Sequence, residues 1–263
     1  MLRAPMPVDN QLYDRLGATW WDEDALLGLL RTSINPGRFG YMRRVLTQEL
    51  DIAPHGRTAL DVGCGGGLLA EEFAGLGCRV TGVDPSAESL TTARSHAASS
   101  GLEIEYVVGS GEHLPFEDGP FDIVYCCDVL EHVDDLQRTL DESARVLKAG
   151  GVYMYDTINR TLRSKLVMIK LSQEWRSTAL MEPNLHDWDM FIKPRELVAA
   201  LGRAGLENRD LQGIGPARNP VALIRDMRRR ARGELSFAEF GNRNKMREQR
   251  DRSLLFAGYA IKR

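Results

Sequence analysis

The stretch that most constrains the fold runs from Thr58 to Pro85 and alternates short apolar runs with a cluster of glycines. Residues 59–62 form the first apolar run, and four glycines follow within 63–67. Apolar residues then recur at helical spacing, and a second apolar run, 78–83, leads directly into an acidic residue. This order predicts a buried strand, a glycine turn, a helix and a parallel strand, the front half of a nucleotide-binding α/β unit.

The details of the turn narrow the choice of ligand. Glycine lets the backbone bend sharply and a ligand approach without a Cβ in the way. The dinucleotide fingerprint requires glycine where this chain has Leu68, and no Lys-Ser/Thr pair follows as in a phosphate-binding P-loop. What remains is Asp61 ahead of the compact GCGGG turn and Asp84 at the end of the second strand, where ribose hydroxyls would lie. This combination resembles the nucleoside-binding signature of class I S-adenosylmethionine-dependent methyltransferases; the alternative is an α/β turn without a ligand.

Composition argues against several other classes of protein, namely nucleic-acid-binding, metal-finger, secreted and membrane-spanning proteins. The chain has 263 residues, 34 Lys or Arg against 37 Asp or Glu and a net charge of −3, so nothing overall suggests nucleic-acid binding. Its four cysteines have no metal-finger spacing and lie on or beside predicted core strands, which favours reduced thiols in a cytoplasmic protein. We find no signal sequence at the start and no apolar run long enough to cross a membrane.

The rest of the chain continues the α/β alternation. Beyond the first unit, the patterns predict strands at 104–108, 121–127, 151–156, 206–213 and 254–261, and helices at 86–100, 134–147 and 192–205. We therefore expect a Rossmann-like, seven-stranded, mostly parallel sheet with helices on both faces, formed by a methyltransferase domain at 51–263. In such sheets ligands lie beyond the carboxyl ends of the strands. The cofactor-binding candidates at these ends are Asp61, Gly63, Gly65, Asp84, Pro85, Ser110, Gly111 and Cys127, and Asn159 is a substrate-binding candidate after the fifth strand.

Residues 1–50 are predicted to be a helical cover, with helices at 10–16, 22–31 and 39–50 separated by a break at Pro36 and Gly37. One interpretation is a simple cover over a sheet edge. The other is that aromatic and basic side chains of this cover close over the cofactor and substrate; these are Tyr13, Trp20, Trp21 and Arg38. An arginine there could pair bidentately with the carboxylate of an amino acid.

Six further motifs make the resemblance closer: WWDE, INPGRFGYM, LDVGCGGGLLAE, LEHV, INR and HDWDMFIKPRELV. Together they resemble the ubiquinone-biosynthesis O-methyltransferase family over about residues 10–215. Those enzymes methylate catechol hydroxyls on a polyprenylated ring and convert S-adenosylmethionine to S-adenosylhomocysteine. The resemblance implies that Arg38 meets the cofactor carboxylate, Gly63 and Gly65 its methionine portion, and Asp84 its ribose.

The resemblance also implies a divalent cation, such as Mg²⁺, at the exit of the fourth strand. The matching residues are Asp128, Glu131 and His132, although the family usually has Glu at the first position. The alternative for LEHV is a loop and helix start common to many methyltransferases. For transfer to a phenol, His132 and His186 are the candidate bases among five histidines, since histidine accepts protons near neutral pH. The alternative is that they are hydrogen-bonded lid residues.

Two insertions complete the pattern. Residues 159–190 form a lid, and the basic amphipathic stretch 160–176 within it either closes the substrate pocket or contacts a membrane surface. Residues 218–252 carry eleven Lys or Arg against five Asp or Glu and are predicted to be a helical hairpin that departs from the family pattern. The favoured interpretation of this hairpin is a solvated helix or an oligomer contact. The alternative is a patch that binds anionic lipid or nucleic acid.

The sequence therefore predicts a methyltransferase that acts on a small, partly apolar acceptor, with O-methylation of a phenolic or prenylated aromatic compound as the leading hypothesis. A C-methyltransferase of terpenoid or indole metabolism is the alternative on the same scaffold. A non-catalytic module that binds S-adenosylmethionine is the alternative of another class. The expected location is cytoplasmic, with peripheral membrane contact and homo-oligomer formation left open, and no nucleic-acid partner is expected.

Overall fold

The computed structural model describes residues 11–263, which form a mixed sheet of eight strands in the order β3-β2-β1-β4-β5-β8-β6-β7. The strands are β1 (Thr58–Val62), β2 (Arg79–Asp84), β3 (Glu105–Val108), β4 (Phe121–Cys127), β5 (Leu147–Ile158), β6 (Leu206–Pro216), β7 (Met246–Gln249) and β8 (Leu255–Lys262). Strands β1 to β5 pair in parallel, whereas β8 runs antiparallel between β5 and β6. The predicted Rossmann-like class is confirmed.

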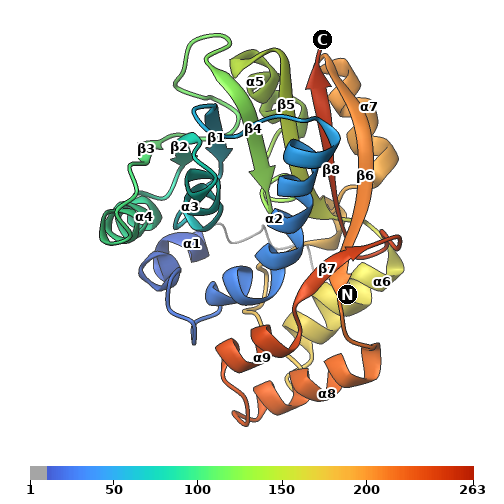
Figure 1. Cartoon of the computed structure of the whole chain (residues 1–263). Helices are drawn as coiled ribbons and strands as arrows, with labels where there is room; N and C mark the ends of the chain where they lie inside the picture. The colour runs from blue at the N-terminus through green and yellow to red at the C-terminus, as the bar shows by residue number, and fades with distance from the viewer. Residues whose placement is uncertain (1–10) are drawn as a thin grey trace.

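Helices cover both faces of this sheet (Figure 1). They are α1 (Gln11–Leu16), α2 (Asn35–Arg44), α3 (Leu68–Gly75), α4 (Ala87–Ser99), α5 (Leu136–Val146), α6 (Leu162–Ser164), α7 (Pro194–Arg203), α8 (Pro220–Ala231) and α9 (Phe237–Arg243). One apolar core joins α2, α3 and α4 to the sheet, and a second joins α5 and α7 to its other face. The central strands are buried on both faces, which explains why β4 is apolar almost throughout.

The strand count differs from the prediction of seven. The additional strand, β7, lies within the insertion that was expected to be wholly helical, and it pairs antiparallel with the end of β6. It has the sequence MREQ and lies at the edge of the sheet, so it lacks the apolar run by which buried strands are found. Short, charged strands are common at sheet edges because charge discourages pairing with other chains.

The N-terminal cover also differs from the prediction. Residues 22–31 were expected to form a helix, but successive tight turns occupy most of this stretch, and a Cβ at Gly28 would lie 2.3 Å from the carbonyl oxygen of Asp22. The expected break at Pro36 and Gly37 is absent, because Pro36 lies in the first turn of α2, where its missing N–H costs little. Gly37 instead admits β7, since a Cβ there would lie 2.8 Å from Met246.

The N-terminal segment, the lid and the insertion gather at the carboxyl ends of the parallel strands, below the sheet in Figure 1. The lid continues from α6 into a π-helix, Lys165–Glu174, and the insertion supplies α8, α9 and β7. These three segments are far apart in sequence, and together they enclose the space where ligands bind in this class of sheet.

Candidate functional site

A cavity of about 570 Å³ lies at the carboxyl ends of β1, β2 and β4. Fourteen of the predicted site residues line it: Tyr13, Trp20, Arg38, Asp61, Gly63, Gly65, Asp84, Pro85, Ser110, Gly111, Cys127, Asp128, His132 and His186. One part of the wall is polar and comes from the strand ends. The other part is apolar and comes from the N-terminal segment, the lid and the insertion.

The glycine turn after β1 is fixed by the acid at the end of β2. Gly63 and Gly65 have φ values of +72° and +52°, a region that residues with a Cβ rarely adopt. The carboxylate of Asp84 accepts hydrogen bonds from the backbone N–H of Gly65 and of Ser86, each at 2.8 Å. Asp84 therefore holds the turn and the start of α4 together, and it lines the cavity at the same time.

Aromatic residues of the N-terminal segment cover the turn. The ring of Trp20 packs so closely that a Cβ on Gly65 or Gly66 would lie within 2.4 Å of it, and its Nε1 donates to Ser89 Oγ at 2.9 Å. Tyr13 stacks on Trp20 with ring centroids 6.2 Å apart. Trp21 is not among the described residues that line the cavity, since its ring stacks on His96 at 3.3 Å.

A buried arginine joins the ends of β4 and β5. Arg38, which is 2% exposed, donates to the carboxylates of Asp128 and Asp156 and, at 3.0 Å, to Asn35 Oδ1. Asp156 also accepts from the backbone N–H of Asp128 at 2.8 Å, and Asp128 has a φ of +54°. Although burial alone would lower the pKa of Arg38, the two carboxylates raise it well above its ordinary value. The guanidinium is therefore a permanent cation on the cavity wall.

The three residues proposed as metal ligands do not converge. The carboxylate of Asp128 pairs with Arg38, and Glu131 Oε2 accepts from Thr157 Oγ1 at 2.8 Å. Within residues 11–263 no group of three or more His, Cys, Asp or Glu side chains is arranged to hold a metal ion. The residues present therefore do not fit the divalent cation that the family resemblance implied, and the chemistry below includes no metal.

Both candidate bases lie on the cavity wall, side by side. The rings of His132 and His186 have centroids 5.1 Å apart, and Tyr13 Oη lies 3.5 Å from His132 Nε2. Burial lowers the pKa of His132 to about 4. Burial, with the neighbouring His132 adding to it, holds the pKa of His186 well below its ordinary value. Both imidazoles are therefore neutral at pH 7.

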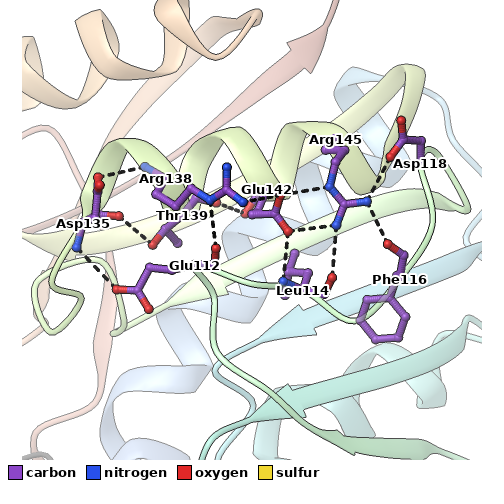
Figure 2. Close-up of polar contacts among 10 residues, drawn as sticks. Glu112, Leu114, Phe116, Asp118, Asp135, Arg138, Thr139, Glu142 and Arg145 are labelled. Carbon is purple, nitrogen blue, oxygen red and sulfur yellow. Dashed lines mark hydrogen bonds and ion pairs between the residues drawn. The ribbon is translucent and has the colours of Figure 1, made fainter.

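The loop after β3 reaches the cavity through Ser110, Gly111 and Glu112, and the carboxylate of Glu112 extends toward the start of α5 (Figure 2). Glu112 Oε1 accepts from the backbone N–H groups of Asp134 and Asp135 at 3.0 and 3.3 Å. Further along α5, Glu142 and Arg145 form hydrogen bonds to the backbone of the same loop. No motif in the sequence indicated this contact.

Asn159 is not among the described residues that line the cavity. Its amide donates to the carbonyl of Arg252 at 2.8 Å, and its backbone N–H donates to the carbonyl of Leu254 at 2.8 Å. It therefore ties the start of the lid to the approach to β8.

Comparison with known proteins decides the family. A model described as a methyltransferase domain matches residues 60–155. A ubiquinone biosynthesis O-methyltransferase of Caulobacter vibrioides is 40% identical over 223 residues, covering 82% of this chain and 86% of its own. One of Bordetella avium is 38% identical, covering 84% of this chain and 90% of its own. The chain belongs to the ubiquinone biosynthesis O-methyltransferase family.

Solved structures agree with this family at the level of the fold. A methyltransferase dependent on S-adenosylmethionine from Methanosarcina mazei superposes with a TM-score of 0.55 at 21% identity, covering 79% of this chain and 93% of its own. One from Aquifex aeolicus has a TM-score of 0.53 at 15% identity, covering 83% and 92%.

As a member of the ubiquinone biosynthesis O-methyltransferase family, the chain is an enzyme that uses S-adenosylmethionine as its cofactor. The alternative of a non-catalytic module is thereby set aside. Across residues 11–263, none of the helices is both long enough and apolar enough to span a bilayer.

Two parts of the site were missed from the sequence. Gln173 on the lid holds the backbone of His186 from both sides: its Oε1 accepts from His186 N at 2.7 Å and its Nε2 donates to His186 O at 3.1 Å. The insertion lines the cavity through Leu223, Met227 and Phe240, although its composition drew attention only to its charges. The apolar residues of α8 recur at helical spacing between those charges, and this was the available signal.

Proposed function

We propose that this enzyme transfers the methyl group of S-adenosylmethionine to a phenolic oxygen on an aromatic ring that carries an apolar substituent, such as a prenyl chain. The observation that carries the proposal is the pair of neutral histidines on the wall of a cavity that is polar in one part and apolar in the other. The names of the relatives in Caulobacter vibrioides and Bordetella avium support the same reaction class.

The polar part of the cavity would hold the cofactor. Asp84 is available to the ribose hydroxyls, and Ser110 and Gly111 to the adenine ring, with Pro85 and Cys127 beside them. The turn at Gly63 and Gly65 would face the methionine portion.

Asp61 and Arg38 suit the two ends of that portion. Asp61 Oδ2 is buried and has no hydrogen-bond partner among residues 11–263, so it can accept from the cofactor's ammonium group. Arg38 is a buried cation beside it in the wall, suited to a carboxylate. When bound, S-adenosylmethionine supplies an electrophilic methyl group.

The acceptor's proton would pass to a histidine. Nδ1 of His186 is buried without a hydrogen-bond partner in the described part of the chain, so this ring nitrogen is the acceptor that we propose for the phenol's proton. Gln173 fixes the backbone of His186, and Tyr13 lies against His132. Holding the phenolic oxygen in line with the methyl group can contribute about 7–11 kcal/mol to the lowering of the barrier. Proton acceptance by a base adds about 10²–10⁴-fold in rate.

Product analysis tests this proposal. The enzyme is incubated with S-adenosylmethionine and a prenylated catechol, and the product is examined by mass spectrometry and NMR. We expect an O-methyl ether, with His186→Gln reducing kcat by about 10²-fold or more while its affinity for S-adenosylhomocysteine stays unchanged. A new carbon–carbon bond would favour the C-methyltransferase alternative, and loss of cofactor binding in His186→Gln would remove the histidine from the role of base.

Such an acceptor resides in membranes, and the proposal extends to a membrane-surface contact through residues 160–176. Leu162, Leu166 and Trp175 are 80%, 47% and 49% exposed in this stretch, where basic side chains alternate with them. Co-sedimentation with anionic vesicles tests the contact. Leu162→Asp should weaken it, whereas Val108→Asp, which changes a comparably exposed residue on β3, should not.

A further inference from the structure

The insertion between β6 and β8 divides its side chains between solvent and the cavity. Arg225 and Arg228 on α8 are exposed, whereas Met227 is 1% exposed. Five residues of the insertion line the cavity: Leu223, Met227, Phe240, Asn244 and Met246. The basic surface of the insertion is thus the outer side of α8 and α9, and the inner side of these helices faces the cavity.

These inner side chains complete an apolar cluster built from segments far apart in sequence. Leu29 of the N-terminal segment and Leu171 of the lid are buried against Met227 of α8 and Phe240 of α9. Four partly buried residues of the same cluster also line the cavity: Leu26, Val167, Leu180 and Leu223. The side chains of this cluster are all apolar, so this part of the wall favours a hydrocarbon group, although Ser172 and Asn244 also line the cavity.

Hydrogen bonds and close packing hold the insertion in place against the N-terminal segment. Asp226, which is 0% exposed, accepts from Arg218 at 2.7 Å and from Asn244 Nδ2 at 3.4 Å, so it joins α8 to both ends of the insertion. Ser33 Oγ donates to the carbonyl of Asn244 at 2.8 Å. A Cβ on Gly241 would lie 2.0 Å from Thr32 Oγ1, so α9 touches the N-terminal segment directly.

The volume sets a limit. A cavity of about 570 Å³ lies within the usual range for a single drug-sized ligand of about 300–1,000 Å³. The cluster around Met227 and Phe240 bounds one side of this cavity.

We infer that Leu223, Met227 and Phe240 form the end wall for the acceptor's apolar substituent and determine the chain length that the enzyme prefers. This inference rests on the proposed function, because it assumes that the acceptor's ring lies beside the histidines. Removing side-chain volume at the wall should admit a longer chain, and adding volume should exclude one.

The test compares catechols with a graded series of prenyl substituents, starting from a single isoprene unit. Phe240→Ala, Phe240→Leu and Met227→Ala enlarge the space, and Leu223→Trp fills it. The control is Val221→Ala on α8, because Val221 is 79% exposed and is not among the described residues that line the cavity. Binding of each catechol to the complex with S-adenosylhomocysteine is measured by calorimetry, and kcat/KM is measured where turnover occurs.

We expect the enlarged variants to shift the preference toward longer chains by about tenfold, the effect of a methylene or more in a hydrophobic pocket. Leu223→Trp should shift it toward shorter chains, and Val221→Ala should leave it unchanged. Folded variants that bind S-adenosylhomocysteine normally and keep the wild-type chain-length profile would overturn the inference. Absence of O-methylated product from the wild type with every catechol would instead contradict the proposed function, and the calorimetric profile would still report on the wall.

Discussion

At the scale of single residues, the site depends on side chains that act on the backbone and face the ligand at once. Asp84 shows this most clearly, because its two oxygens hold Gly65 and Ser86 while the carboxylate lines the cavity. The spacing of acid and glycines in the sequence predicted the turn, but it could not reveal that this acid also fixes the turn's shape.

Replacing Asp84 should therefore weaken cofactor binding twice over, through the lost ribose contact and the loosened turn. We expect Asp84→Ala to lower the affinity for S-adenosylmethionine at least tenfold, or about 1.4 kcal/mol, in calorimetric titration. Glu103→Ala, which removes an exposed acid before β3, is the control and should bind as the wild type does. Equal affinities in Asp84→Ala and the wild type would remove Asp84 from the cofactor site.

The buried carboxyl group of Glu131 should make the stability of the folded protein depend on pH. Burial, with the charge of Asp128 adding to it, raises the pKa of Glu131 from 4.5 to about 8. Its Oε1 is buried without a hydrogen-bond partner among residues 11–263. The folded state thus binds the proton more tightly than the unfolded state, and the stability this contributes is present below pH 4.5 and is lost as pH rises toward 8.

Thermal unfolding of the cofactor-free protein between these pH values tests this. We expect ionisation of Glu131 to remove on the order of a few kcal/mol of stability as pH rises across this range, so the melting temperature of the wild type should fall relative to that of Glu131→Gln. This variant keeps an acceptor for Thr157. Asp61, whose pKa burial also raises to about 8, contributes in the same direction, so Asp61→Asn is the second variant. The buried histidines act in the opposite direction as pH rises through their unfolded-state pKa near 6.5, because below it the unfolded state binds protons that the folded state does not, so the comparison with Glu131→Gln isolates the effect of the carboxyl group. A fall in Glu131→Gln as steep as in the wild type would contradict the assignment.

At the scale of elements, the sequence predicted what repeats locally and missed what depends on distant contacts. The strand 121–127 coincides with β4, and the cap at Ser86 is present, with its Oγ accepting from Ser89 N. The residues around Pro36 were predicted wrongly because a Pro-Gly pair usually breaks a helix, whereas here β7, more than 200 residues later, packs onto Gly37. Local propensity cannot include such a partner.

In the candidate site, too, residues in local sequence patterns were predicted and residues placed by distant contacts were missed. The acid and glycines after β1 and the loop residues after β3 were found because the strand order determines where their loops lie. Phe240 and Met227 were not found, because only the folding of the insertion onto Leu29 turns their side chains toward the ligand. Trp21 was placed near the substrate on sequence grounds, but its contacts are with His96 and the carbonyl of Gly66.

The helix α5 provides a prediction at this scale, because it holds the loop that lines the adenine side of the cavity (Figure 2). Glu142 Oε2 accepts from Leu114 N at 3.0 Å, and Arg145 donates to the carbonyls of Leu114 and Phe116 at 3.0 and 2.7 Å. In Glu142→Ala the buried N–H of Leu114 loses its partner, which costs about 1–3 kcal/mol of stability.

The loosened loop should also weaken the binding of adenosine and of S-adenosylhomocysteine by similar factors, since both contain the adenine ring. Calorimetry with the two ligands measures this. Asp141→Ala changes the neighbouring, exposed acid on the same helix and is the control. If only S-adenosylhomocysteine were affected, the loop would not be acting on the adenine end.

At the scale of the whole molecule, the N-terminal segment, the lid and the insertion meet at the carboxyl ends of the strands (Figure 1), and all three line one cavity. The strand ends supply polar groups such as Asp61 and Asp84, and the added segments supply the apolar cluster together with a few polar groups such as Arg38 and His186. This division suggests that the two parts can be weakened independently, although they share one continuous space.

Asp226 tests that independence. Its carboxylate is fully buried on α8, and its partners are Arg218, Arg243 and Asn244, none of which belongs to the sheet's glycine turn. Asp226→Ala should cost about 1–3 kcal/mol of stability, less than for an ion pair buried on both sides, because Arg218 keeps access to water. The insertion should then move, so the affinity for the prenylated catechol should fall while that for S-adenosylhomocysteine stays unchanged.

This pattern is the reverse of the one expected for Asp84→Ala, and measuring both ligands on both variants by calorimetry gives the decisive comparison. Asp226→Asn, which keeps one oxygen as an acceptor, should lie between Asp226→Ala and the wild type. If Asp226→Ala lost both ligands equally, the cavity would have to be treated as one cooperative unit, in which the insertion supports the cofactor end as much as the acceptor end. Retained cofactor affinity with weakened catechol binding would instead establish the insertion as a separate specificity element built onto the methyltransferase sheet.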